Sequence, residues 1–214
     1  MLKDIFASLP YNNRPAPRGP VEYIVAGLGN PGTKYENTRH NAGFIALDAL
    51  AKRCGARVDR LQFKALTAET SIGGHRALLM KPETFMNLSG EAVTQAMRFY
   101  KIPPEHTIIL FDDISLEPGQ LRIRRKGSAG THNGMRNIIA LSNSQLFPRI
   151  RLGVGAKPEA WDLADWVLSR FTQQENEQLQ KAAQHAAEAV ELIMDGQIDE
   201  AMNRYNRVMT EWNA

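Results

Sequence analysis

The chain has 214 residues, a formal net charge of +3 at pH 7 and a hydrophobic content of 43%. This length suits a single domain with one sizeable core, and the composition excludes wholesale disorder and a fibrous architecture. No apolar run reaches the roughly 18 residues that a membrane span needs, and the first twenty residues lack the pattern of a secretory signal. We therefore expect a cytoplasmic location and no membrane partner.

The first part of the chain predicts an irregular arm followed by a strand and a helix. Residues 1–20 carry four prolines and no sustained periodicity, which is typical of an irregular arm, and we expect the folded domain to occupy 21–214. The run "YIVAG" (23–27) is apolar throughout, which predicts a strand that is covered on both faces. Apolar residues then recur at helical spacing over 40–55, which predicts an amphipathic helix.

The middle of the chain predicts a hairpin and a second helix. Two strand-like segments, 62–72 and 75–81, are separated by "GG", which favours a tight hairpin. Residues 87–102 have apolar side chains at helical spacing, and Ser89 is a candidate cap for this second helix.

The second half again alternates strands with helices. Further strands are predicted at 107–111, 120–126 and 149–155, and further helices at 135–142 and 174–196. In the 120–126 strand, Arg122 and Arg124 fall on the side opposite the apolar residues. This order predicts a single-domain, three-layer α/β fold with a twisted mixed sheet flanked by helices.

Polar side chains gather where predicted strands end, which is where open α/β sheets bind ligands. His40 is the strongest candidate for acid–base work because imidazole titrates near neutral pH. Asp112 ends a buried strand and could hold that imidazole in one tautomer. The plainer alternatives are a helix cap or surface histidine and a strand-end turn residue.

Three asparagines lie in loops that contain glycine or proline, and these are Asn30 in "GNPG", Asn87 in "MNLSG" and Asn133 in "HNGM". A carboxamide both donates and accepts hydrogen bonds, so several together could bind an ester or amide and stabilise an oxyanion. Asparagine beside glycine is also common turn chemistry, and it is their number that favours a site.

Other chemistries find little support in the sequence. "GSAGTHNG" (127–134) lacks the lysine and spacing of a phosphate-binding loop, and "GLGNPG" lacks the context of a dinucleotide site. The chain has no "GxSxG" motif for a serine nucleophile. A metal site built from His40, Asp112, Asp113 and His132 is conceivable, but no "HExxH" or "CxxC" spacing accompanies it. We predict neither a metal nor a cofactor.

Four motifs in this order, "GLGNPGTKYENTRHNAGF", "KPETFMNLSG", "FDDISLEPG" and "GSAGTHNGMRNI", resemble the bacterial peptidyl-tRNA hydrolase family from about Tyr23 to about Asn206. The resemblance implies a monomeric, metal-independent α/β enzyme that cleaves the ester between a peptide and the 3′ end of tRNA and so recycles tRNA from stalled translation. It implies tRNA as the partner.

The resemblance also implies roles for single residues. His40 matches the family's catalytic histidine, Asp112 matches the acid that stabilises its basic form, and Asn30 matches a residue that helps to separate peptidyl from free aminoacyl substrate. Tyr35, Phe85, Asn87 and Asn133 match positions that hold the tRNA 3′ end and the peptide. Arg122, Arg124 and Arg151 match basic positions that contact tRNA phosphates, although they could also form an ordinary solvated strand face.

Three departures from the family pattern stand out: the long arm, Ser115 in place of a frequent acid, and Thr131 in place of a frequent glycine. None of them changes the proposed base, its carboxylate or the three asparagines. A catalytically inactive RNA-binding relative of the same fold is the main alternative, and retention of the whole polar set argues against it. A generic carboxylesterase or amidase is weakened by the missing serine nucleophile.

Overall fold

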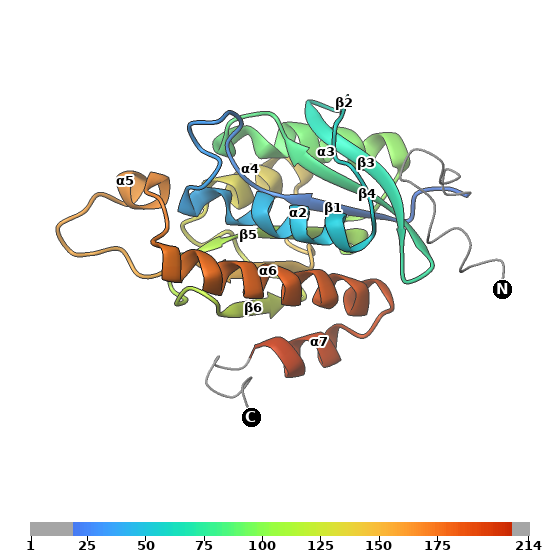
Figure 1. Ribbon diagram of the computed structural model, residues 1–214. Helices are drawn as coiled ribbons and strands as arrows, with labels where there is room; N and C mark the ends of the chain where they lie inside the picture. Colours follow the sequence, from blue (N-terminus) through green and yellow to red (C-terminus); the bar gives the residue numbers. More distant parts are fainter. Residues whose placement is uncertain (1–18, 207–214) are drawn as a thin grey trace.

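A computed structural model describes residues 19–206 of the chain, and the predicted arm, apart from Gly19 and Pro20, lies outside the described residues. The described residues form a seven-stranded sheet in the order β2-β3-β4-β1-β5-β7-β6. Its centre, β4-β1-β5-β7, is parallel, and antiparallel strands flank it on both sides. The predicted mixed sheet flanked by helices is confirmed (Figure 1).

The strands are β1 (Tyr23–Gly27), β2 (Arg60–Gln62), β3 (Ala65–Ile72), β4 (His75–Pro82), β5 (Thr107–Asp113), β6 (Leu121–Arg124) and β7 (Arg149–Gly153). The α-helices are α2 (Ala42–Arg53), α3 (Ser89–Tyr100), α4 (Asn133–Ser142), α5 (Leu163–Leu168), α6 (Gln173–Met194) and α7 (Ile198–Tyr205). Short 3₁₀ turns are η2 (Arg39–Asn41), η3 (Met86–Leu88) and η4 (Pro104–His106). None of the helices among residues 19–206 is long and apolar enough to cross a membrane.

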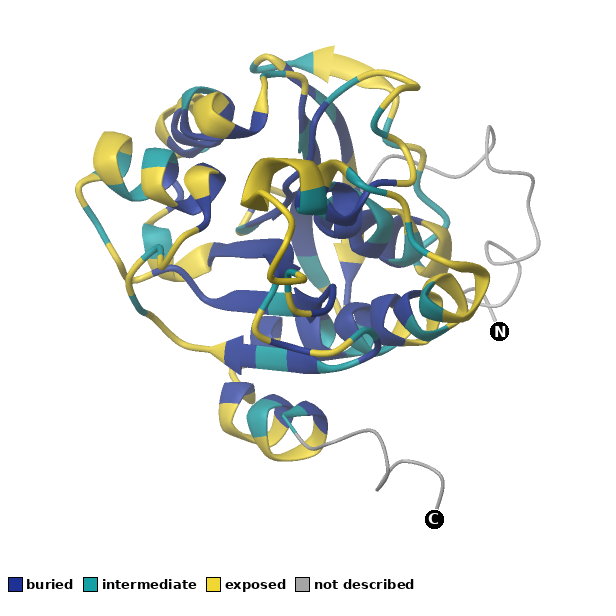
Figure 2. Cartoon of the chain, turned by 90° about the vertical axis from the view of Figure 1, so that its left-hand side faces the viewer, coloured by how far each residue is buried: buried dark blue, intermediate teal, exposed yellow. Residues whose placement is uncertain are grey.

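Two apolar cores lie on opposite faces of the sheet, and each is closed by its own helices. Helices α2, α6 and α7 contribute to one core, while α3 and α4 cover the other. In β1, Val25 belongs to the first core, whereas Ile24 and Ala26 belong to the second, because side chains alternate along a strand. Figure 2 shows the buried strands between helices with exposed outer faces.

The structure differs from the sequence predictions in local detail. Ser89 is not the cap of α3: it is the first helical residue, its hydroxyl donates to the carbonyl of Met86 at 2.8 Å, and Leu88 holds the cap position without a side-chain bond. The helix was predicted from residue 87 but begins at Ser89, because residues 86–88 form the 3₁₀ turn η3. The sequence reasoning also missed β2, α5 and α7, because three, six and eight residues carry too little periodicity to be recognised.

The outer edge of β6 is closed by a side chain. The amide N–H of Ile123 donates to Oδ1 of Asn206 at 2.6 Å, and Nδ2 of Asn206 donates to the carbonyl of Ile123 at 3.2 Å. The carboxamide therefore makes the pair of bonds that a neighbouring strand would make.

Close contact between helix α2 and the sheet brings the start of that helix to the edge where the parallel strands end. A Cβ atom on Gly43 would lie 2.3 Å from the carbonyl oxygen of Leu110 and 2.5 Å from that of Leu28. Only a residue without a side chain fits between these backbones. The glycine thereby places η2, the turn immediately before α2, against the ends of β1 and β5.

We predict that Gly43→Ala destabilises the chain by about 3 kcal/mol, because rigid backbone must move to admit the methyl group and this exceeds the gain in helix propensity. For a chain of this size the melting temperature should fall by roughly 6 to 12 °C. Lys52→Ala, an exposed change on the same helix, is the control and should alter stability by less than about 0.5 kcal/mol. Equal melting temperatures for both variants would contradict the packing argument.

Candidate active site

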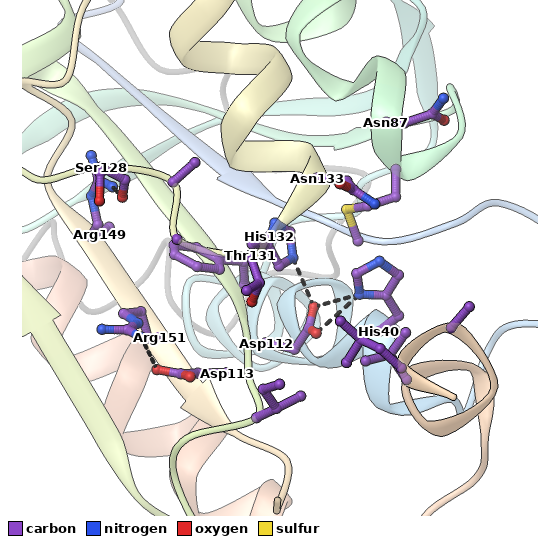
Figure 3. Close-up of a pocket in the computed structure, with 18 of the residues that line it drawn as sticks. His40, Asn87, Asp112, Asp113, Ser128, Thr131, His132, Asn133, Arg149 and Arg151 are labelled. Atoms are coloured by element: carbon purple, nitrogen blue, oxygen red, sulfur yellow. Dashed lines mark hydrogen bonds and ion pairs between the residues drawn. The ribbon is translucent and has the colours of Figure 1, made fainter. Parts of the chain in front are cut away.

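A cavity of about 860 Å³ opens at the edge of the sheet where the parallel strands end. Its wall includes the loop after β1, the turns η2 and η3, the end of β5, the loop before α4, and α5 (Figure 3). Segments far apart in the chain meet here because the carboxyl ends of parallel strands share one edge. Among the residues predicted from sequence, the cavity wall includes His40, Asp112, Asn30, Phe85, Asn87, Asn133, Arg124 and Arg151.

Two predicted residues do not reach the wall of this cavity. Tyr35 is half-buried in the turn that follows β1, and Arg122 is half-buried in β6 next to residues that do line the cavity. Their predicted contacts with substrate remain predictions.

His40 and Asp112 are in direct contact although 72 positions separate them in the sequence. Nδ1 of His40 lies 2.9 Å from Oδ1 and 3.0 Å from Oδ2 of Asp112, whose residue is only 4% exposed. An ionised carboxylate accepts hydrogen bonds, so this contact places the ring proton on Nδ1. Nε2 then carries the lone pair and points away from Asp112 (Figure 3).

A second histidine contacts the same carboxylate. Nε2 of His132 lies 3.0 Å from Oδ1 of Asp112, and Nδ1 of His132 accepts the backbone N–H of Met135 at 3.2 Å. A backbone amide can only donate, so Nδ1 of His132 is unprotonated and Nε2–H donates to Asp112. Sequence reasoning named His132 only as a possible metal ligand. No sequence signal marked this role, because histidine is not a preferred N-cap residue and the helix, which begins at Asn133, was predicted to begin at Met135.

Burial and neighbouring charge shift the pKa values of Asp112 and His40 in opposite directions. Burial raises the pKa of the Asp112 carboxyl, but the charges and hydrogen bonds of His40 and His132 outweigh that effect and hold the pKa well below its usual value. Burial lowers the pKa of His40, but the charge of Asp112 and its hydrogen bond outweigh it, so the pKa is raised overall. Asp112 is therefore ionised at neutral pH, and it makes Nε2 of His40 more basic.

Asn30 is fixed by three hydrogen bonds that leave one end of its carboxamide for a ligand. Its Oδ1 accepts the backbone N–H of Met86 at 2.8 Å, which fixes the orientation of the amide. Its backbone N–H and carbonyl are both bound to the side chain of Asn41, at 2.8 and 3.0 Å. The NH₂ group of Asn30 is thus the half of the carboxamide available in the cavity.

Asn87 and Asn133 are exposed (Figure 3). Asn87 lies in η3, immediately before α3, and Asn133 is the first residue of α4. Oδ1 of Asn133 accepts from Nη1 of Arg136 at 3.0 Å, which leaves its NH₂ group for another acceptor. The two helices are fixed to each other because the N–H of Gly90 donates to Oδ1 of Asn137 at 2.7 Å. The cavity wall therefore offers several amide donors around His40.

Four arginines form two cross-strand pairs beside the cavity. Arg122 lies opposite Arg151, and Arg124 lies opposite Arg149. Like charges directly opposite one another destabilise a sheet, so such a cluster favours an anionic ligand. Asp113 forms an ion pair with Arg151 and offsets part of this charge.

Arg149 was not predicted as a site residue, and it is 2% exposed. Its guanidinium donates to three backbone carbonyls, those of Phe147 at 3.1 Å, Ser128 at 2.8 Å and Gln145 at 3.1 Å. Burial, together with the nearby charge of Arg151, lowers the pKa of Arg149 to about 10, so it remains a cation at neutral pH. It braces the glycine-rich loop that leads to His132.

Potential metal ligands in His40, Asp112 and His132 lie within 4.8 Å of one another. Nδ1 of His40 and Nε2 of His132 are already hydrogen-bonded to Asp112. As it stands, the arrangement is that of a carboxylate between two imidazoles, which suits proton transfer.

Comparison with known proteins identifies the family. Residues 24–213 match the model of the family described as peptidyl-tRNA hydrolase. The chain belongs to the peptidyl-tRNA hydrolase family. A relative from Caldanaerobacter subterraneus subsp. tengcongensis, named peptidyl-tRNA hydrolase, is 55% identical over 86% of this chain and 99% of its own length. Another of that name from Agathobacter rectalis is 53% identical over 86% of this chain and all of its own length.

Solved structures of the family have the same fold. The crystal structure of peptidyl-tRNA hydrolase from Acinetobacter baumannii has a TM-score of 0.82 and 34% identity, and the match covers 89% of this chain and 97% of that one. A structure described as the complex of peptidyl-tRNA hydrolase with N-propanol also has a TM-score of 0.82, at 35% identity over 86% of this chain and 94% of that one.

The two departures from the family pattern within the described residues have different surroundings. Ser115 donates to Oδ1 of Asp113 from both its backbone N–H, at 2.9 Å, and its hydroxyl, at 2.7 Å. It thus orders the turn that follows β5. Thr131 is exposed and lines the cavity beside His132.

We predict that the pKa of His40, followed by NMR titration of its ring signals, is above its ordinary value of about 6.5 and falls in Asp112→Asn. The amide keeps the ring buried, which lowers the pKa, but removes the charge that raises it. His106→Gln, which removes a histidine outside this cavity, is the control and should leave the His40 titration unchanged. A His40 pKa that is the same in Asp112→Asn would show that the carboxylate does not set it.

Proposed function

We propose that this chain hydrolyses the ester between the peptide and the 3′ ribose of peptidyl-tRNA, with His40 as general base. The observation that carries the proposal is the contact between His40 and Asp112, which leaves Nε2 of His40 as a basic atom at the cavity. Membership of the peptidyl-tRNA hydrolase family supports the substrate.

The proposed reaction needs one water and no further reactant. Nε2 of His40 takes a proton from the water as its oxygen attacks the ester carbonyl carbon, and the carbonyl oxygen becomes an oxyanion. When the tetrahedral intermediate collapses, the bond from carbon to the ribose oxygen breaks, and His40 returns its proton to that oxygen. Asp112 stabilises the imidazolium that exists between the two transfers.

The amides around His40 supply the uncharged donors that this chemistry uses. We assign the oxyanion to the NH₂ groups of Asn87 or Asn133, and contact with the peptide backbone to that of Asn30. Phe85 is 57% exposed at the rim, where its ring can stack on a base of the tRNA 3′ end, and we place Tyr35 on the same approach.

The arginines beside the cavity suit the rest of the substrate. We propose that Arg122, Arg124 and Arg151 contact tRNA phosphates, because such contacts give affinity without sequence preference. Every group in the proposal comes from one chain, so a monomer suffices, and we place its action in the cytoplasm, where translation supplies peptidyl-tRNA.

The test is the release of N-acetyl-amino acid from N-acetyl-aminoacyl-tRNA, with unblocked aminoacyl-tRNA and an EDTA arm in parallel. We expect wild type to cleave the blocked substrate, and His40→Ala to lower kcat by about 10²- to 10⁴-fold because the general base is lost. His75→Ala, which removes a histidine outside this cavity, is the matched control. Tight tRNA binding by the wild type without cleavage would support the inactive RNA-binding alternative instead.

We predict that Arg122→Gln with Arg124→Gln weakens tRNA binding and lowers the slope of log affinity against log salt by about 1 for each lost phosphate contact. Binding is measured by filter retention between low and physiological salt. Arg98→Gln on helix α3, outside the cavity wall, is the control and should leave the slope unchanged. An unchanged slope in the double variant would show that these arginines form a solvated strand face.

A further inference from the structure

Arg39 immediately precedes His40, and its side chain is buried although burial of a charged group costs free energy unless the group is paired. The residue is 3% exposed. Its Nη2 lies 2.9 Å from both carboxylate oxygens of Glu175, and its Nη1 donates to the carbonyl of Val154 at 2.7 Å. Its Nε donates to the hydroxyl of Ser169 at 3.1 Å. Three separate segments therefore converge on this guanidinium.

Aromatic rings and backbone contacts complete the surroundings of Arg39. The guanidinium carbon lies 3.8 Å from the ring centroid of Trp166 and 4.9 Å from that of Phe171. The backbone N–H of Arg39 donates to the carbonyl of Ser169 at 3.0 Å. A planar cation stacked on aromatic rings and hydrogen-bonded at its edges has a single position.

These contacts hold helix α5, which forms one wall of the cavity. Four of its six residues line the cavity, and these are Leu163, Ala164, Val167 and Leu168. A six-residue helix has little stability of its own, so tertiary contacts must hold it in place. Trp166, on the side of α5 away from those residues, stacks on the guanidinium of Arg39. Ser169 is the C-cap residue of α5.

The same guanidinium is linked to the segment beside Asp112. The carbonyl of Val154 accepts the hydrogen bond from Nη1 of Arg39, and the N–H of Val154 donates to the carbonyl of Asp113 at 3.1 Å. Glu175 in turn closes the capping box at the start of α6 with Thr172. Arg39 thus connects the turn that carries His40, the end of the strand that carries Asp112, and the cavity wall that α5 forms.

We propose that Arg39 is a positioning residue for hydrolysis, which keeps α5 closed against His40 and Asp112. This inference rests on the function proposed above. Nothing in the reaction requires Arg39 to touch the substrate. Its effect is on geometry, where a misplacement of about 1 Å can cost about 10²-fold in rate.

Lysine cannot replace Arg39 in this position. An ammonium group retains the charge but has no planar fork, so it cannot meet Glu175, Val154 and Ser169 together while it lies flat on Trp166. We expect Arg39→Lys to lower kcat by about 10- to 100-fold, with KM for N-acetyl-aminoacyl-tRNA within about twofold, because the phosphate-binding arginines lie elsewhere.

The pH profile separates positioning from simple support of the fold. The titratable groups in contact with His40 are Asp112 and His132. If α5 moves away, His40 becomes more hydrated while Asp112 stays beside it. Burial lowers the pKa of His40, so its relief raises that pKa and moves the acid limb of kcat/KM to higher pH.

The matched control is Arg76→Lys, since Arg76 is also a buried arginine with an acidic partner, Glu69, but lies on β4 outside the cavity wall. We expect Arg76→Lys to lower the melting temperature while kcat and the pH limb stay at wild-type values. Glu175→Gln gives a second test, because glutamine preserves the capping box but removes the charge that Arg39 pairs with. It should lower kcat in the same direction as Arg39→Lys and by less.

Each outcome decides between explanations. A folded Arg39→Lys variant with wild-type kcat and pH limb overturns the inference, as does an equal loss of kcat in Arg76→Lys. Should Arg39→Lys fail to fold, an unchanged kcat in Glu175→Gln overturns it in the same way. Wild-type enzyme that does not cleave the blocked substrate rejects the proposed function itself, which is a separate result.

Discussion

A buried carboxylate between two imidazoles is the constraint on which the site depends. Asp112 is 4% exposed, and an ionised carboxylate at such a position is tolerated only with strong hydrogen-bond donors around it. His40 and His132 are those donors. Because His132 takes its tautomer from a backbone amide and His40 takes its tautomer from Asp112, the free lone pair on His40 follows from the fold and not from chance.

The fold supplies this arrangement through backbone proximity. Gly43 lets α2 rest on β1 and β5, so the turn that carries His40 begins beside the end of the strand that carries Asp112. The loop before α4 brings His132 from the other side, and Arg149 ties that loop, through the carbonyl of Ser128, to the segment after α4, through those of Gln145 and Phe147. The geometry of His40, Asp112 and His132 is thus set by rigid elements, with short turns at their ends.

Much of the architecture could be predicted because long apolar runs have a clear period. The central strands were predicted from these apolar runs. The rule that parallel strands end at one edge made Asp112 a candidate partner of His40, and the resemblance to the family implied that role. The contacts of Arg39 could not be predicted, since Glu175 lies 136 positions away and no periodic pattern links the two. Helix α5 was missed for a related reason: its six residues are held by tertiary contacts and not by a local signal.

The carboxamide of Asn206 has a consequence beyond the site. It occupies both hydrogen-bonding groups of Ile123 on the outer edge of β6, where the sheet would otherwise present an unpaired strand. An open edge of this kind is a template onto which a strand of a second molecule can be added. Asn206, which follows α7, therefore protects the chain against growth of its sheet from one copy to the next.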